Sequence, residues 1–309
     1  MKLRLSEVKR FFGLATRVAA HSSWLPQRGC ETVAVESSFE LHLQRRGLFS
    51  SDVVAYDAGR PGYPDRVYEL LQRVCGLEPG SRVLEIGPGT GQATGALLEC
   101  GATVTAVELG AEMAAALEAK YQGQDLSVEV GAFEEVALDH ESFDLIVAAT
   151  SFHWVPPETG LPRCADLLRP GGWLALWWTY FGDPDRPDPF RDAVTPIFQE
   201  LAPSLIDTFP GMAFLAGAHP HAVDAEARTG EIDATARFGP VHYEAIPWMG
   251  RHTPAQLRAL FASYSPCLAL PPADRARVLD AIEHLATDTF HGVVERPYLT
   301  LIYLAQRQN

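Results

Sequence analysis

The chain has 309 residues, 47% of them hydrophobic and 21% charged, a composition typical of a globular protein with a large core. Its formal net charge of −14 disfavours a nucleic-acid partner, because a phosphate backbone requires a basic surface. No apolar run reaches the roughly 18 residues that cross a bilayer. We therefore expect neither a nucleic acid nor a membrane as a partner.

Residues 1–47 differ in charge from the rest of the chain, and we expect them to form an N-terminal extension to a domain over residues 48–309. The extension contains eight Lys or Arg residues against four Glu residues. Its first part, Lys2 to Ala20, has the apolar spacing of a basic amphipathic helix. Both a loosely held extension and a lid over a functional site agree with this pattern.

The five cysteines are scattered, odd in number and free of C-x-x-C spacing, so we expect reduced thiols and a cytoplasmic protein. The close histidine pair His219 and His221 has no further candidate ligand in its loop, so we expect no metal site. The cysteines are Cys30, Cys75, Cys100, Cys164 and Cys267.

The sequence pattern in the first part of the domain predicts alternating strands and helices. Glycines and prolines between Asp57 and Pro64 predict a loop, and apolar residues at helical spacing predict a helix over Asp65–Val74. Short apolar runs then predict five strands, with helices over 93–100, 111–121 and 161–168 and a turn over 169–172. The strands are Arg82–Ile86, Thr103–Glu108, Leu126–Val130, Phe143–Ala149 and Trp173–Tyr180.

After Tyr180 the pattern loosens, and prolines interrupt the helical pieces. We expect an insertion over residues 181–236 that builds a substrate pocket, because binding loops and insertions usually sit on a rigid scaffold. Two more strands and two more helices complete the chain. The strands are Val241–Trp248 and Val293–Ala305, and the helices are 254–263 and 273–287.

The most informative stretch is Val83 to Gln92, a buried strand followed by Gly87, Gly89 and Gly91. Such a turn allows the backbone to approach a ligand, and the next helix directs its free N–H groups to the same place. The spacing differs from the G-x-G-x-x-G of dinucleotide sites, because position 92 is Gln. The pattern therefore predicts a cofactor site of another kind.

Two acids lie next to this turn. Glu85 precedes the first glycine, and Glu108 ends the following strand. A carboxylate would repel a pyrophosphate but suits a ligand with a positive amino group, and Glu108 is placed to accept both hydroxyls of a ribose. An adenosine with a cationic amino-acid tail fits these residues better than NAD does, so a nicotinamide-dependent oxidoreductase is the weaker alternative.

The sequence E-x-G-x-G-x-G, with an acid ending the second strand, resembles the class I S-adenosylmethionine-dependent methyltransferases. Three further stretches, Tyr56–Pro64, Phe133-Glu134 and Ser151–Val155, resemble the small-molecule branch that includes trans-aconitate methyltransferase-like enzymes. The resemblance covers about residues 49–307. It implies an α/β fold with a Rossmann-like, seven-stranded, mostly parallel sheet, helices on both faces, an antiparallel last strand and a helical insertion after strand five.

The resemblance also implies that S-adenosylmethionine is the cofactor. Arg60 would either pair with the carboxylate of this donor or tie its own loop to the domain. Met113 and Phe133 would either border the adenine or fill the core. The candidate donor-binding residues are Tyr56, Arg60, Glu85, Gly87, Gly89, Gly91, Glu108, Leu109, Met113, Phe133 and Thr150.

The acceptor site is expected where the fourth strand runs into Thr150–Trp154, because ligands of open α/β sheets bind outside the carboxyl ends of the strands. His153 is the candidate catalytic residue, either as a general base or as a wall of the pocket. Strand alternation places Trp178 and Tyr180 on one face of the sheet and Trp177 on the other. The candidate acceptor-binding residues are Trp154, Trp178, Tyr180, Trp248 and Tyr264.

The insertion lacks the cluster of arginines that a tricarboxylate would need, since Arg186, Arg191 and Arg228 are dispersed among acids. We therefore expect methyl transfer to a weakly charged, aromatic or heterocyclic small molecule. Two alternatives stay open, a non-catalytic or repurposed module that binds S-adenosylmethionine and an enzyme that esterifies a small carboxylic acid. The sequence does not indicate an oligomeric state.

Overall fold

A computed structural model describes residues 53–183, 185–203, 205 and 225–308. The predicted extension over residues 1–47, Cys30 and the pair His219 and His221 lie outside the described residues. None of the described helices is long and apolar enough to cross a membrane.

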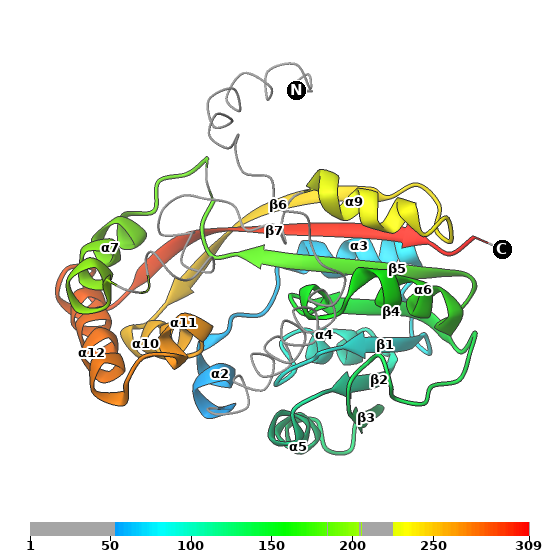
Figure 1. Cartoon of the computed structure of the whole chain (residues 1–309), viewed down its shortest axis with the longest axis horizontal. Coiled ribbons are helices and arrows are strands. Elements are labelled where there is room, and N and C mark those ends of the chain that lie inside the picture. Colours follow the sequence, from blue (N-terminus) through cyan, green and yellow to red (C-terminus); the bar gives the residue numbers. More distant parts are fainter. Residues whose placement is uncertain (1–52, 184, 204, 206–224, 309) are drawn as a thin grey trace, which may run out of the picture. The chain divides into compact units, whose positions relative to one another are not determined.

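The described residues form a seven-stranded sheet with the strand order β3-β2-β1-β4-β5-β7-β6 (Figure 1). Strands β1 to β5 pair in parallel, and β7 is antiparallel to both of its neighbours. This confirms the predicted Rossmann-like sheet. The strands are β1 Arg82–Ile86, β2 Thr103–Glu108, β3 Leu126–Val130, β4 Phe143–Ala149, β5 Leu168–Tyr180, β6 His242–His252 and β7 Val294–Gln306.

Helices cover both faces of the sheet, as predicted. On one face, α3 and α4 pack their apolar residues against Val83 of β1 and Trp177 of β5. On the other face, α6 and α9 pack against Trp178 of β5. The described helices are α2 Val53–Gly59, α3 Asp65–Cys75, α4 Thr94–Glu99, α5 Ala111–Lys120, α6 Pro157–Leu167, α7 Pro189–Leu201, α9 Ala225–Ala234, α10 Pro254–Ala262, α11 Ser265–Leu268 and α12 Pro272–Asp288.

The local sequence explains where these elements begin and end. In α3, Val67, Leu70 and Leu71 lie on one helical face and are all fully buried. The helix ends at Gly76, whose φ of 71° suits a glycine better than any other residue. Strand β4 is apolar at nearly every position because the sheet is covered on both faces.

A second helical layer lies beyond the carboxyl end of β5. Helices α7, α10 and α12 share one apolar core, in which Phe190, Phe261 and Ile282 are buried. Helices α7 and α9 follow β5, as predicted for the insertion, whereas α10, α11 and α12 lie between β6 and β7. The layer is therefore built from two separate parts of the chain, and Figure 1 shows α7, α10, α11 and α12 grouped together.

Two local predictions were wrong. Helix α2 extends to Gly59, so the first three residues of the predicted loop over Asp57–Pro64 are helical. Gly59 is buried against α10, where an added Cβ would lie 2.2 Å from Leu260 N, so this glycine permits close packing and does not break the helix. The predicted turn over 169–172 instead belongs to β5, whose pairing with β4 shifts register between Phe143 and Leu145.

Candidate functional site

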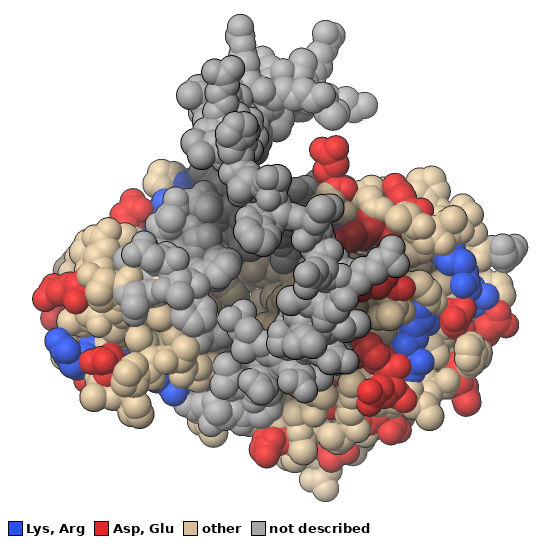
Figure 2. Space-filling model, in the orientation of Figure 1, with Lys and Arg blue, Asp and Glu red and all other residues tan. Residues whose placement is uncertain are grey.

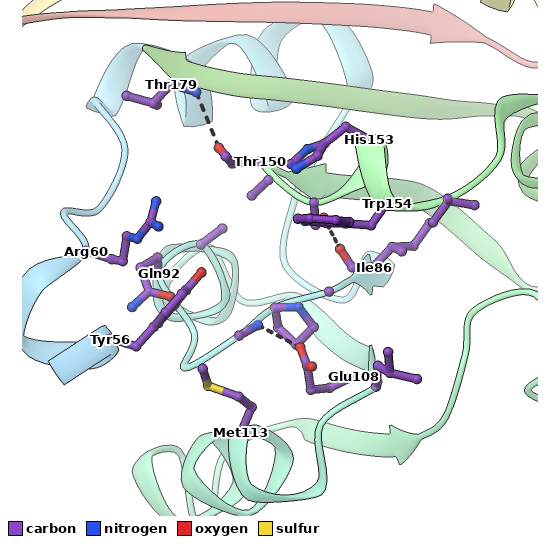
Figure 3. A pocket seen from close by; sticks show the side chains of 18 of the residues that line it. Tyr56, Arg60, Ile86, Gln92, Glu108, Met113, Thr150, His153, Trp154 and Thr179 are labelled. Carbon is purple, nitrogen blue, oxygen red and sulfur yellow. Dashed lines mark hydrogen bonds between the residues drawn. The ribbon is translucent and has the colours of Figure 1, made fainter. Parts of the chain in front are cut away.

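A cavity of about 310 Å³ opens at the carboxyl ends of β1, β2, β4 and β5 (Figure 3). Residues at or next to the ends of these strands line it, among them Ile86, Glu108, Ala149 and Thr179. In the sheet β1 lies between β2 and β4, so the strand order reverses direction beside it. Ligands of open α/β sheets bind at such a position.

The glycine turn after β1 forms the floor of this cavity. Gly87 and Gly89 have φ values of 65° and 59°, in the region that favours glycine. A Cβ on Gly87 would lie 2.8 Å from Ser151 Cβ, and a Cβ on Gly89 would lie 3.2 Å from a ring carbon of Tyr56. The turn therefore exposes its main chain to the cavity and leaves no room for a side chain.

Glu108 joins this turn to the end of β2. Gly89 N donates to Glu108 Oε2 at 3.0 Å, and Gly110 N donates to Glu108 Oε1 at 2.9 Å. Each carboxylate oxygen has two lone pairs, so the carboxylate can accept further hydrogen bonds, such as those from vicinal hydroxyls. Figure 3 shows Glu108 and Met113 on the same side of the cavity, across from His153 and Thr179.

Gly91 and Glu85 lie on the side of the turn that faces away from the cavity. Gly91 does not line the cavity; a Cβ there would lie 2.5 Å from Tyr121, whose hydroxyl donates to Gly91 O at 2.9 Å. Glu85 is fully buried, and Thr94 Oγ1 donates to its Oε2 at 2.6 Å. Burial raises the pKa of Glu85 to about 7.

Helix α2 brings Tyr56, and Arg60 directly after the helix, to the cavity wall. Arg60 Nε donates to Ser263 Oγ at 2.9 Å, and its Nη2 donates to Ser263 O at 3.2 Å. The Arg60 guanidinium carbon lies 5.3, 5.4 and 5.2 Å from the ring centroids of Tyr56, Phe181 and Tyr264. Arg60 therefore ties α2 to the end of α10 while it lines the cavity, so both roles considered from the sequence agree with its position.

Thr150 marks the point where β4 enters the cavity. Its φ of 57° is unusual for a β-branched residue, and such strain concentrates at functional sites. Three contacts hold this conformation. Thr150 N donates to Trp177 O at 2.7 Å, and Thr150 Oγ1 accepts from Tyr63 Oη at 3.2 Å and from Thr179 N at 3.3 Å.

A short 3-10 helix, Phe152–Trp154, follows and brings His153 and Trp154 to the cavity. Their ring centroids lie 4.9 Å apart. Trp178 Nε1 donates to His153 Nδ1 at 3.1 Å. His153 thus lies where β4 and β5 end, held by a residue of the neighbouring strand.

The structure brings most of the predicted donor-binding residues together. Glu85 and Gly91 lie outside the cavity lining, as described above. The predicted donor-binding residues that line the cavity are Tyr56, Arg60, Gly87, Gly89, Glu108, Leu109, Met113, Phe133 and Thr150.

Only some of the predicted acceptor-binding aromatics reach the cavity. Trp154 and Tyr264 line it. Trp178 and Tyr180 are buried in the core on the α6 face of the sheet, and Trp248 Nε1 donates to Thr300 Oγ1 at 3.0 Å. The sequence reasoning missed other lining residues, some of which lay within the quoted stretches; among them are Tyr63, Gln92, Ser151, Thr179, Phe181 and Pro266.

The residues at this cavity fit an adenosyl ligand with a cationic amino-acid tail. A main-chain turn without side chains borders one part, and a carboxylate that can accept paired hydroxyls lies next to it. Met113 and Phe133 supply buried apolar walls of the kind that a purine ring packs against. The donor set therefore suits a nucleoside rather than a pyrophosphate.

Comparisons with known proteins agree with this assignment. The methyltransferase domain family matches residues 84–176. An uncharacterized methyltransferase of Mycobacterium tuberculosis is 31% identical over 237 residues, which are 77% of this chain and 84% of that protein. An uncharacterized methyltransferase-like protein of Schizosaccharomyces pombe is 26% identical over 247 residues, 77% of this chain and 85% of that protein.

A solved structure shares the fold. Phosphoethanolamine N-methyltransferase 2 of Haemonchus contortus, in complex with phosphomonomethylethanolamine and S-adenosylhomocysteine, superposes with a TM-score of 0.53 at 16% identity. The superposition covers 88% of this chain and 60% of that one, so this chain spans less than two thirds of the Haemonchus protein.

Proposed function

The chain belongs to the S-adenosylmethionine-dependent methyltransferases, and we propose that it methylates a weakly charged, aromatic or heterocyclic small molecule. The observation that carries this proposal is one continuous cavity that extends from Glu108 to His153. Its Glu108 side suits the donor, and two aromatic rings line other parts of it, Trp154 beside His153 and Tyr264 beside Arg60. A flat acceptor stacks well against such rings.

Individual residues would then hold the donor in defined ways. Glu108 would accept the ribose hydroxyls, and the main chain at Gly87 and Gly89 would border the amino-acid tail. Met113 and Phe133 would pack on the adenine. Arg60 would meet the donor carboxylate with the part of its guanidinium that Ser263 does not bind.

The donor supplies a methyl group that its sulfonium already activates, so the protein has mainly to position the acceptor and exclude water. Holding the reacting atoms about 3 to 3.5 Å apart in line contributes roughly 7 to 11 kcal/mol in favourable cases. His153 and Trp154 lie at the end of the cavity across from Glu108, where they would orient the acceptor (Figure 3). The strained Thr150 lies at the same end as His153, bonded to Thr179, and fixes the shape of this wall (Figure 3).

The charge of the described residues supports a small acceptor without strong negative charge. Arg60 is the only Lys or Arg among the described residues that line the cavity, and Ser263 already binds it. On the face drawn in Figure 2, acidic side chains outnumber the interspersed basic ones over the described surface, which suits neither DNA nor RNA. A small carboxylic acid, the alternative acceptor, is favoured by Arg60 alone.

The cysteines support an intracellular location. The four described cysteines are free, and Cys75, Cys164 and Cys267 are buried. Burial raises the pKa of the Cys75 and Cys267 thiols to about 12, so these thiols are poor nucleophiles for disulfide exchange. A cytoplasmic protein accordingly remains our proposal.

Release of S-adenosylhomocysteine from S-adenosylmethionine, measured over a panel of small acceptors, tests the proposed function. We expect release with neutral aromatic or heterocyclic compounds and weaker release with dicarboxylates and tricarboxylates. Calorimetry should show binding of S-adenosylhomocysteine and none of NAD. Release that is greatest with a tricarboxylate would contradict the proposed acceptor class.

A further inference from the structure

The hydrogen bond between Trp178 and His153 fixes the position of a proton. An indole N–H is only a donor, so His153 Nδ1, 3.1 Å from Trp178 Nε1, must be the acceptor. A neutral imidazole that accepts at Nδ1 carries its proton on Nε2. The structure therefore indicates the tautomer of neutral His153 that has its proton on Nε2.

The surroundings of Trp178 favour this bond. The Trp178 side chain is 2% exposed, and a buried indole N–H without a partner is costly. The ring of Tyr303 meets it edge to face at 5.9 Å and limits its rotation. The indole is thus held in the one direction in which it donates to His153.

A cation from the insertion also contacts this indole. Arg228 of α9 lies with its guanidinium carbon 5.8 Å from the Trp178 ring centroid, and its own charge is paired with Glu231. A cation over an aromatic ring attracts the ring electrons, which makes the indole N–H a better donor. The insertion therefore contacts the candidate catalytic residue through Trp178.

We propose that Trp178 is a positioning residue that fixes His153 as a hydrogen-bond donor, so that His153 orients the acceptor and does not remove a proton from it. This inference rests on the proposed function and deepens it. The attacking atom would use a lone pair that is already available, such as that of a ring nitrogen or a carboxylate. That lone pair forms the bond to the methyl carbon, the carbon–sulfur pair remains on sulfur, and no proton moves.

The other titratable groups of the described cavity lining agree with this role. Glu108 lies across the cavity from His153 and is held by two main-chain N–H groups. Burial raises the pKa of Tyr56 and Tyr63, and it raises that of Tyr264 to about 12, so these phenols keep their protons near neutral pH and do not act as bases there. Among the described lining residues, then, none of these groups takes over the role of a base if His153 acts as a donor.

Nitrogen NMR of the full chain, labelled with ¹⁵N at histidine and tryptophan side chains, tests the inference without donor or acceptor. The His153 signals are assigned by their loss in His153→Gln. We expect a protonated Nε2, an unprotonated Nδ1, and a coupling across the hydrogen bond between Trp178 Nε1 and His153 Nδ1. A protonated Nδ1 in the wild-type protein would overturn the inference.

Trp178→Phe removes the donor and keeps an aromatic ring, so the Nδ1 signal of His153 should shift to that of a nitrogen without this bond. Trp177→Phe is the matched control, because Trp177 is equally buried on the opposite face and its Nε1 has no hydrogen-bond partner among the described residues. It should leave the His153 signals unchanged. Equal His153 spectra for wild type and Trp178→Phe would refute the inference, and if Trp178→Phe does not fold, the wild-type spectrum decides alone.

Calorimetry with S-adenosylhomocysteine separates this inference from the proposed function. Binding of the nucleoside tests the function, whereas the tautomer of His153 tests the inference. Trp178→Phe should bind the nucleoside with unchanged affinity, because Trp178 does not line the cavity. Loss of binding in a folded Trp178→Phe variant, with Trp177→Phe unaffected, would contradict a role confined to His153.

Discussion

Glu108 Oε2 accepts a hydrogen bond from Gly89 N at 3.0 Å, which joins the end of β2 to the glycine turn after β1. Two sequence features 19 residues apart thus form one structural unit. The carboxylate fixes the conformation of the turn, and such preorganisation lowers the entropy that binding must overcome.

Glu108→Ala should therefore weaken binding of S-adenosylhomocysteine. The variant loses both the acceptor for the ribose hydroxyls and the support of the turn, and a charged hydrogen-bond partner contributes on the order of 1 to 3 kcal/mol. Calorimetry measures the change. Glu129→Ala, at an exposed position of β3, is the control and should bind as the wild type does. Equal affinities of the two variants would show that Glu108 does not contact the donor.

Gly89→Val should abolish binding of the same nucleoside, because the new side chain would enter the cavity beside Tyr56. The control is Gly123→Val, since Gly123 also has a positive φ, 84°, but has nothing within 4 Å of an added Cβ. Both variants should lose about 1 to 2 kcal/mol of stability from backbone strain. Only Gly89→Val should lose affinity, and normal affinity in this variant would rule out the turn as the binding element.

Glu85 should make the protein less stable as the pH rises from 5 to 8. Burial raises its pKa from 4.5 to about 7, so the folded state binds more protons than the unfolded state in this range. The stabilising contribution is present in full below about pH 4.5 and is lost as the pH rises through 7. For a fully buried group, the loss between pH 5 and 8 is about 2 to 3 kcal/mol.

Denaturant unfolding at several pH values checks this prediction. Burial lowers the pKa of His252 to about 4, which changes the unfolding free energy in the opposite direction over this range, so the prediction concerns the difference between wild type and variant. Glu85→Gln should remove the contribution of Glu85, because the amide does not ionise and can still accept from Thr94 Oγ1. Glu129→Gln should retain it. If wild type and Glu85→Gln show the same pH dependence of the unfolding free energy, Glu85 does not titrate in this range.

His153 variants distinguish a hydrogen-bond donor from a base. With an acceptor found in the panel, His153→Ala should lower turnover about two- to tenfold, the effect of one hydrogen bond of about 0.5 to 1.5 kcal/mol, with little change in donor affinity. His153→Gln should recover part of the loss, because its amide also donates. His140→Ala, at an exposed position, is the control. A loss of roughly 10² to 10⁴ in both His153 variants would instead indicate a general base.

The glycine turn and the position of Glu108 beside it were predictable because their signals are local, whereas the burial of Glu85 behind the turn was not. A short apolar strand followed by glycines predicts a turn open to a ligand. The carboxyl ends of neighbouring parallel strands meet at one edge of the sheet, so Glu108 had to lie near Gly87 and Gly89. Glu108 and the two glycines, which follow different strands, could therefore be placed together from the strand pattern alone.

The aromatic residues of β5 show where this reasoning stops. Alternation correctly separated Trp177 from Trp178 and Tyr180, but it does not say which helices cover each face. Helices α6 and α9 close the face that Trp178 occupies. Its indole contacts His153 from behind the cavity wall, a relation between two strands that the sequence pattern of one strand does not reveal.

Helix α2 shows the same limit. From its neighbours in sequence, Gly59 predicts the end of a helix. In the structure it is helical, and a side chain at this position would collide with α10. The contact partner, Leu260, lies about two hundred residues away in the sequence. The tie from Arg60 to Ser263 depends on the same packing, and no local pattern predicts it.

A crystal structure of the protein with S-adenosylhomocysteine tests the central claim most directly. We expect the ribose hydroxyls at Glu108, the amino-acid tail along Gly87 and Gly89, and the sulfur facing the part of the cavity that His153 and Trp154 line. A nucleoside bound elsewhere, or bound in this cavity with its ribose away from Glu108, would contradict the account.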